Sequence, residues 1–212
     1  REEGLRIKGV PTSTRTAELA RNLGVPVTSL DDAKWLDLTI DGADEFDAQL
    51  NLIKGGGAAL LQEKIVATAS DQMIVITDAA KEVAQLGAFP LPVEVIPFGW
   101  QTTKALIEET LVSMDVLDRD VTLRMNGQAP LVTDEANYIV DLHLKRIGNA
   151  RQLALVLNQI PGVVENGLFI DICDKVIIGH GDGRVVTRDI NSGETLDEQI
   201  EFADSDNIFA DF

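Results

Sequence analysis

Apolar and polar positions along the chain follow two periods, and their alternation predicts an α/β protein. Continuous apolar runs such as Met73 to Thr77 are typical of strands covered on both faces, whereas the apolar residues of Gly57 to Ser70 recur at helical spacing. In the first part of the chain we expect strands at Leu5 to Val10, Val25 to Ser29, Trp35 to Ile40 and Met73 to Thr77, and helices at Thr16 to Leu23, Gly57 to Ser70 and Ala79 to Leu86. This order predicts a Rossmann-like, mostly parallel sheet covered by helices.

A second pattern begins after the segment Phe89-Pro90-Leu91-Pro92, where two prolines disfavour a helix. The expected elements are a strand at Val93 to Ile96, a helix at Thr102 to Ser113, strands at Val121 to Met125 and Tyr138 to Leu144, a helix at Ala150 to Gln159 and a strand at Val163 to Leu168. The order βαββαβ predicts a smaller, ferredoxin-like α+β domain over residues 91–168.

The last part of the chain is expected to return to the first sheet. Two strands, Phe169 to Gly179 and Arg184 to Ile190, are joined by a turn-rich link and predict a hairpin. Residues 1–90 and 169–212 would then form the larger α/β domain, which we expect to be the catalytic one. The final 22 residues hold seven acidic residues and no Lys or Arg, so we interpret them as a solvated appendage.

Charge and cysteine content restrict the partners and the compartment. The 212 residues contain 18 Lys and Arg against 35 Asp and Glu, a net charge of −17 that disfavours binding to nucleic acid or an anionic membrane. The single cysteine, Cys173, allows no internal disulfide, and no apolar run is long enough to span a bilayer. We therefore expect a soluble cytoplasmic protein with no nucleic-acid or membrane partner, whose anionic ligands are bound by local cations.

An acidic loop follows the strand predicted at Trp35 to Ile40. It reads Asp41-Gly42-Ala43-Asp44-Glu45, and loops at the carboxyl ends of parallel strands line the ligand crevice of α/β folds. Two other interpretations are open: an ordinary solvated turn, and a magnesium site made by Asp41, Asp44 and Asp47, since carboxylate oxygens suit hard cations.

A glycine loop, Lys54-Gly55-Gly56-Gly57, precedes the next helix. Consecutive glycines let the backbone approach a ligand closely, and the free N–H groups at the start of a helix attract anions. The loop matches neither phosphate-binding pattern, G-x-x-x-x-G-K-[S/T] or G-x-G-x-x-G. An anion cradle is the favoured interpretation, and a flexible hinge is the alternative.

Glu63 is the candidate general base. It lies beside the apolar face of the helix, and burial there would raise its pKa towards the range that suits proton abstraction at neutral pH. A surface charge pair with Lys64 is the alternative. Asp78 and Lys81 follow the strand Met73 to Thr77, which places them at the same sheet edge as the acidic loop. Together these groups suit removal of a C–H proton next to a carbonyl, without a metal or an organic cofactor.

Four ordered motifs carry a resemblance to a known family. Asp41-Gly42-Ala43-Asp44-Glu45, Lys54-Gly55-Gly56-Gly57-Ala58-Ala59-Leu60, Glu63-Lys64-Ile65 and the segment from Phe89 to Pro97 resemble the ribose-5-phosphate isomerase family, type A. The resemblance implies interconversion of ribose 5-phosphate and ribulose 5-phosphate through an enediolate, with no cofactor, in a homodimer or homotetramer. It also implies that Glu63 accepts the proton and that the sugar phosphate contacts Asp41, Gly42, Ala43, Asp44, Lys54, Gly55, Gly56, Gly57 and Lys81.

One departure and two rival functions accompany this resemblance. The family carries an N-terminal helix, a strand and a G-x-G-S-T type loop that do not occur here, so we expect that segment to be missing from this chain. A CoA transferase is one rival, because its E-N-G motif matches Glu165-Asn166-Gly167. A sugar-phosphate sensor is the other, although binding alone would not require Glu63 together with both lysines.

Overall fold

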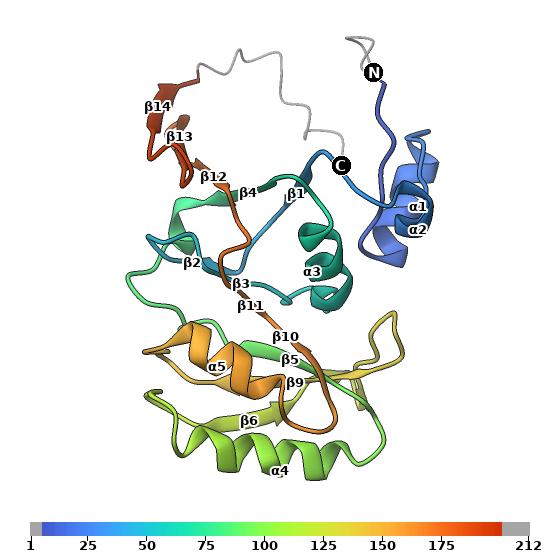
Figure 1. Cartoon of the computed structure of the whole chain (residues 1–212), viewed down its shortest axis with the longest axis vertical. Coiled ribbons are helices and arrows are strands. Elements are labelled where there is room, and N and C mark those ends of the chain that lie inside the picture. The colour runs from blue at the N-terminus through green and yellow to red at the C-terminus, as the bar shows by residue number, and fades with distance from the viewer. Residues whose placement is uncertain (1–5, 201–212) are drawn as a thin grey trace.

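The computed structural model describes residues 6–200 and consists of two main sheets with helices packed around them (Figure 1). The helices are α1 (Thr14–Asn22), α2 (Leu30–Ala33), α3 (Leu60–Thr68), α4 (Trp100–Leu111), α5 (Ala150–Leu157) and the 3₁₀ helix η1 (Ala79–Lys81). None of these helices has the length and apolar character needed to span a bilayer.

The larger sheet has five described strands in the order β1-β4-β12-β13-β14. They are β1 (Thr39–Asp41), β4 (Met73–Asp78), β12 (Lys175–Gly179), β13 (Arg184–Asp189) and β14 (Thr195–Gln199). β1, β4 and β12 are parallel, whereas β13 and β14 continue the sheet antiparallel. The α/β class and the return of the last part of the chain are therefore confirmed, and the sheet is mixed beyond its three parallel strands.

The smaller sheet has four antiparallel strands in the order β10-β5-β9-β6. They are β5 (Leu91–Val95), β6 (Asp120–Leu123), β9 (Tyr138–His143) and β10 (Val163–Asn166). With α4 after β5 and α5 after β9, the observed order is the βαββαβ pattern expected from the sequence. Figure 1 shows this unit below the five-stranded sheet, with α3 between the two.

Short strands connect these units. β2 (Glu45–Phe46), β3 (Leu52–Ile53) and β11 (Leu168–Phe169) form a three-stranded sheet, and β7 (Met125–Asn126) pairs with β8 (Ala129–Pro130). Phe46, Leu52 and Phe169 are fully buried in a core against the five-stranded sheet, while a second core lies between the four-stranded sheet, α4 and α5. The domain boundaries at residues 90 and 169 stay a prediction.

Several predicted elements are shorter than expected. At the start of the chain, Gly9 and Val27 form a single bridge instead of two strands, while Leu5 lies outside the described residues. Pro11 and Pro26 flank that bridge and have no N–H to extend it. The segment Trp35 to Ile40 forms a continuous strand only from Thr39, after a single bridge between Leu36 and Ser70, and Phe169 to Gly179 divides into β11 and β12.

The helix predicted at Ala79 to Leu86 is wrong beyond Lys81. Glu82 bridges to Phe46, and the Val83 N–H donates to the Phe46 carbonyl at 2.9 Å, so pairing with β2 replaces helical hydrogen bonds. Leu86 is buried in the core beside the four-stranded sheet. Pairing with the distant strand β2 therefore outweighs the helical periodicity of this segment.

The acidic tail is only partly the appendage expected. Thr195–Gln199 forms β14 and pairs along β13, with every residue exposed. The strand is solvated, as its composition predicted, but it extends the sheet. The acidic residues from Glu201 onward lie outside the described residues.

Gly167 provides a test of how the two units join. Its N–H donates to the Pro92 carbonyl at 2.8 Å and its carbonyl accepts from the Lys54 N–H at 2.9 Å. A Cβ at this position would lie 2.2 Å from the Lys54 carbonyl oxygen. Gly167→Ala should therefore lower the free energy of unfolding by about 1–3 kcal/mol, measured by chemical denaturation.

Gly181→Ala is the matched control, because a Cβ there meets nothing within 4 Å. Equal stability of the Gly167→Ala and Gly181→Ala proteins would contradict this account of the junction.

Candidate active site

The ten residues singled out from the sequence line one cavity of about 170 Å³. They are Asp41, Gly42, Ala43, Asp44, Lys54, Gly55, Gly56, Gly57, Glu63 and Lys81. They come from the ends of β1, β3 and η1, the glycine loop and the first turn of α3. Topology accounts for much of this meeting, because the parallel strands β1 and β4 both deliver their carboxyl ends to this edge.

The acidic loop is tied to the glycine loop by hydrogen bonds. The Gly42 N–H donates to Asp41 Oδ1 at 2.8 Å, which turns the chain at the end of β1. Asp44 Oδ2 accepts from the Gly56 N–H at 2.7 Å. The two loops predicted separately from the sequence therefore form one wall of the cavity.

Lys54 is the central cation of the cavity and only 3% exposed. Its Nζ donates to the Gly42 carbonyl at 2.6 Å and lies 3.0 Å from Asp41 Oδ2 and 3.2 Å from Glu63 Oε2. A buried charge needs such compensation. Both of these carboxylate oxygens are buried, so their contacts with Lys54 form ion pairs shielded from solvent.

The pKa of Glu63 is raised above the ordinary glutamate value of 4.5. Burial is the largest cause, because it penalises the charged carboxylate. The positive charge of Lys54 opposes this effect, and the negative charge of Asp41 adds to it. The direction of the shift expected from the sequence is confirmed.

The glycines of the loop are required by its shape. Gly55 has a φ of +109°, and a Cβ there would lie 2.8 Å from the Leu60 side chain. A Cβ on Gly56 would lie 2.6 Å from the Asp44 carboxylate. Ala58 has a φ of +63°, so the helix begins at Leu60 instead of Gly57. These contacts indicate a fitted loop, not a hinge.

Lys64 points away from the cavity and orients α3. Its Nζ lies 2.9 Å from Glu165 Oε1, donates to the Asn166 carbonyl at 2.5 Å and lies 4.9 Å from the centre of the Phe169 ring. A surface pair between Glu63 and Lys64 is therefore wrong. Glu165, the residue of the E-N-G match, forms a structural ion pair.

Lys81 ends η1 and faces the cavity, and it forms no ion pair with the part of the chain that the structure describes. Asp78, which the sequence placed at the same edge, accepts the Ala80 N–H at 2.9 Å and caps η1. Asp78 is not among the residues that line the cavity. Lys81 is thus the cation available to an anionic ligand.

The magnesium interpretation is not supported by the positions of its three carboxylates. Asp47 turns away from Asp41 and Asp44: its Oδ1 accepts from the Gln49 and Asn51 N–H groups at 2.9 Å each. Within residues 6–200 no group of three or more His, Cys, Asp or Glu side chains could hold a metal ion.

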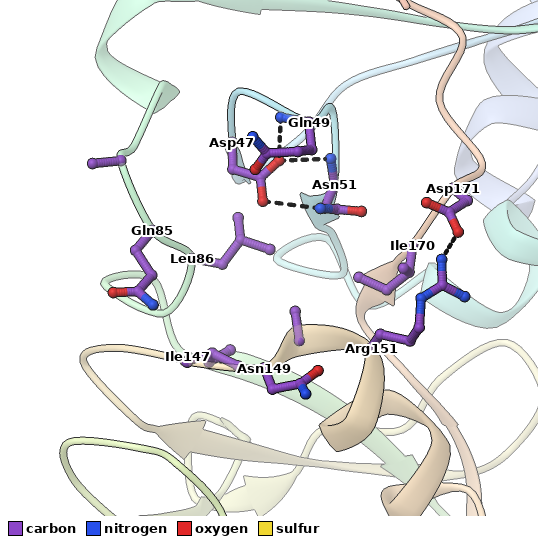
Figure 2. A pocket seen from close by; sticks show the side chains of 13 residues that line it. Asp47, Gln49, Asn51, Gln85, Leu86, Ile147, Asn149, Arg151, Ile170 and Asp171 are labelled. Carbon is purple, nitrogen blue, oxygen red and sulfur yellow. Dashed lines mark hydrogen bonds and ion pairs between the residues drawn. The ribbon is translucent and has the colours of Figure 1, made fainter.

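Asp47 instead lines a second, larger cavity of about 370 Å³ (Figure 2). In Figure 2 its carboxylate contacts Asn51, while Arg151 pairs with Asp171 on the opposite side. The charged groups drawn there are therefore engaged with their neighbours. We place the candidate active site in the smaller cavity, because that cavity combines a carboxylate of raised pKa with two lysines.

Sequence reasoning missed one group beside the glycine loop. Arg124 Nη1 donates to the Gly55 carbonyl at 2.7 Å and to the Gly56 carbonyl at 3.2 Å. Arg124 lies almost seventy positions beyond the loop, between β6 and β7, and no motif or periodicity marks it.

Comparisons with known proteins identify one family. Residues 8–183 match the model of the family described as ribose 5-phosphate isomerase A (phosphoriboisomerase A). The chain is 74% identical over 211 residues to a ribose-5-phosphate isomerase A of Ruegeria pomeroyi and 76% identical to one of Cereibacter sphaeroides, covering 100% of this chain and 80% of each relative.

Solved structures of the same kind are similar in fold. One is a D-ribose-5-phosphate isomerase in complex with phospho-erythronic acid, 42% identical with a TM-score of 0.81, covering 89% of this chain and 80% of that one. Another is ribose 5-phosphate isomerase A from Methanocaldococcus jannaschii, 38% identical with a TM-score of 0.80, covering 89% and 81%.

The charge balance around Glu63 yields a titration experiment. Asp41→Asn removes a negative charge and leaves Glu63 as the carboxylate that pairs with Lys54, so the pKa of Glu63 should fall. The folded state binds the Glu63 proton more tightly than the unfolded chain, so this group's contribution to stability declines as pH rises from 4.5 through the raised pKa. Asp41→Asn should weaken that decline.

Carboxyl-carbon NMR measures the pKa, and denaturation at several pH values measures the stability. Asp78→Asn is the control, because Asp78 is not among the groups that shift Glu63. A Glu63 pKa that stays the same or rises in the Asp41→Asn protein would refute the assigned balance.

Proposed function

The chain belongs to the ribose 5-phosphate isomerase A family and interconverts ribose 5-phosphate and ribulose 5-phosphate, and we propose that Glu63 is the general base of this reaction. The reaction is an aldose–ketose isomerisation of the pentose phosphate pathway. The surroundings of the Glu63 carboxylate carry this proposal. The carboxylate lines the cavity, has a raised pKa and lies 3.2 Å from the buried ammonium group of Lys54.

The proposed chemistry is a proton transfer through a cis-enediolate. The Glu63 carboxylate removes the proton from C2 of the open-chain aldose, and the electrons of that C–H bond form the C1–C2 double bond as the C1 carbonyl oxygen becomes an enolate. Return of the proton to C1, with transfer of the O2 proton to O1, leaves the carbonyl at C2 and completes the ketose. Each step balances without a redox partner.

Lys54 is proposed to stabilise the negative charge that develops on the enediolate oxygens. Its Nζ lies between Asp41 and Glu63, so a substrate oxygen in the cavity would be within reach of the same ammonium. A well-placed donor to such an oxyanion contributes roughly 2.7–4 kcal/mol in other enzymes. The lysine therefore serves the base and the intermediate at once.

The phosphate group is proposed to bind Lys81 and the N–H groups of the glycine loop. The net charge of −17 repels anions at long range, so capture depends on cations and N–H groups inside the cavity. Lys81 and the exposed Gly56 and Gly57 backbone border that space. Asp41 and Asp44 are proposed to bind the sugar hydroxyls.

The ligand of one similar structure supports this assignment. Phospho-erythronic acid, bound by a D-ribose-5-phosphate isomerase 42% identical to this chain, combines a phosphate with a carboxylate. The charge of a carboxylate is shared by two oxygens, as is the charge of an enediolate. On this relationship we expect the compound to occupy the cavity around Glu63 and to compete with substrate.

We propose further that the protein works in the cytoplasm as a homodimer or homotetramer and uses no cofactor. Its single cysteine supports a reducing compartment. The oligomeric state is carried over from the family resemblance.

Replacing Glu63 by Gln tests the base. Glu63→Gln keeps the shape of the side chain but removes the proton acceptor, so kcat should fall by roughly 10²–10⁴-fold. Exchange of the substrate C2 proton with deuterated solvent should stop, while binding of phospho-erythronic acid persists. NMR follows the exchange, and calorimetry follows the binding.

Glu108→Gln is the control, since Glu108 pairs with Lys104 on α4 away from the cavity. Continued C2 exchange in the Glu63→Gln protein at the wild-type rate would assign the base to another group.

Metal dependence is a separate test. Because a carboxylate and ammonium groups account for every proposed step, dialysis against EDTA should leave kcat and KM unchanged. Loss of activity that Mg²⁺ restores would favour a carboxylate-bound ion instead.

A further inference from the structure

We propose that Arg124, held in place by Asp141, is a positioning residue that sets the direction of the N–H groups in the glycine loop. This inference rests on the proposed function of that loop, which is to bind the anionic oxygens of the sugar phosphate. Arg124 reaches the loop through its carbonyl oxygens, and no contact between Arg124 and the substrate is required.

Arg124 binds two consecutive peptide units of the loop from one side. Its Nη1 donates to the Gly55 carbonyl at 2.7 Å and to the Gly56 carbonyl at 3.2 Å. In a planar trans peptide the carbonyl and the following N–H point in opposite directions. The N–H groups of Gly56 and Gly57 must therefore point away from Arg124.

The first of these peptide units verifies the direction. The N–H of Gly56 donates to Asp44 Oδ2 at 2.7 Å, and Asp44 lines the cavity. This unit is thus held at its oxygen by Arg124 and by the Ala58 N–H, which donates to the Gly55 carbonyl at 3.0 Å, and at its nitrogen by Asp44. By the same geometry the N–H of Gly57, which also borders the cavity, is directed to the cavity side, where it can meet an anionic oxygen.

The guanidinium is itself immobilised. Its Nε donates to Asp141 Oδ2 at 2.8 Å and its Nη2 contacts Asp141 Oδ1, a bidentate pair with both side chains 15% exposed. The Arg124 N–H donates to the Ile139 carbonyl at 2.8 Å. Asp141 belongs to β9, so the four-stranded sheet supplies a fixed support for a loop that belongs to the other unit.

Only arginine suits this position. Its planar fork binds a carboxylate with two nitrogens and still offers an N–H to the loop carbonyls, whereas lysine has one ammonium nitrogen on a flexible stem. A small displacement of groups that bind the substrate can slow a reaction greatly, even when the changed residue does not touch it.

The test compares Arg124→Lys with Arg119→Lys in the full-length protein. Arg119 is the matched control, because its Nε also donates to a backbone carbonyl, that of Leu111, at 2.8 Å but away from the cavity. We expect kcat/KM for ribose 5-phosphate to fall about 10–100-fold in Arg124→Lys and to stay near the wild-type value in Arg119→Lys. Thermal unfolding is measured for both proteins.

Two further readouts separate positioning from a general loss of structure. Added guanidinium ion should restore part of the activity of an Arg124→Ala protein. The titration of Glu63 should keep its wild-type position in Arg124→Lys, since Arg124 is not among the groups that shift it.

Wild-type kcat/KM in both Arg124 variants, or an equal loss in Arg119→Lys, would overturn the proposal. A slow Arg124→Lys protein alongside a fully active Glu63→Gln protein would retain the positioning role and reject Glu63 as the base.

Discussion

The buried ammonium of Lys54 is the constraint on which the site depends. A charge that is 3% exposed must be compensated where it lies, and the compensation comes from Asp41, Glu63 and the Gly42 carbonyl. Asp41 and Gly42 belong to the acidic loop at the end of β1, Glu63 stands on α3 and Lys54 itself begins the glycine loop, so satisfying one cation brings three segments together. The same requirement explains the polar lining of a cavity that includes Ala43 of one apolar core and Lys54, which follows Ile53 of the other.

Two opposing effects act on Glu63, and their balance decides its chemistry. Burial raises its pKa and exceeds the lowering by Lys54. A fully buried carboxyl with no cation nearby would be neutral and could not accept a proton, whereas a fully solvated carboxylate would be a weak base. Lys54 keeps the Glu63 carboxyl group ionisable and burial keeps it basic, a combination that neither effect supplies alone.

Much of the fold and the cavity followed from the sequence because those features rest on local rules. The acidic loop and Lys81 follow parallel strands, and Glu63 lies beside the apolar face of a helix that opens after glycines. The contacts that were missed join distant segments: Arg124 to the Gly55 carbonyl, and Val83 to β2. A side chain that binds a backbone carbonyl almost seventy positions away leaves no periodic pattern in the sequence. Pairing with a distant strand prevents the helix that a local periodicity predicts.

The strong negative charge of the chain and an anionic substrate are compatible once distance is considered. Exposed charges are screened over about 8 Å at physiological ionic strength, so acidic residues on remote surfaces act weakly on a ligand inside the cavity. In the proposed binding mode, Lys81 and the loop N–H groups act at contact distance, where screening is small. Asp41 and Asp44 are closer and would repel the phosphate, but each is engaged, Asp41 by Lys54 and Asp44 by the Gly56 N–H. The contacts that orient the loop therefore also reduce the repulsion that the substrate meets.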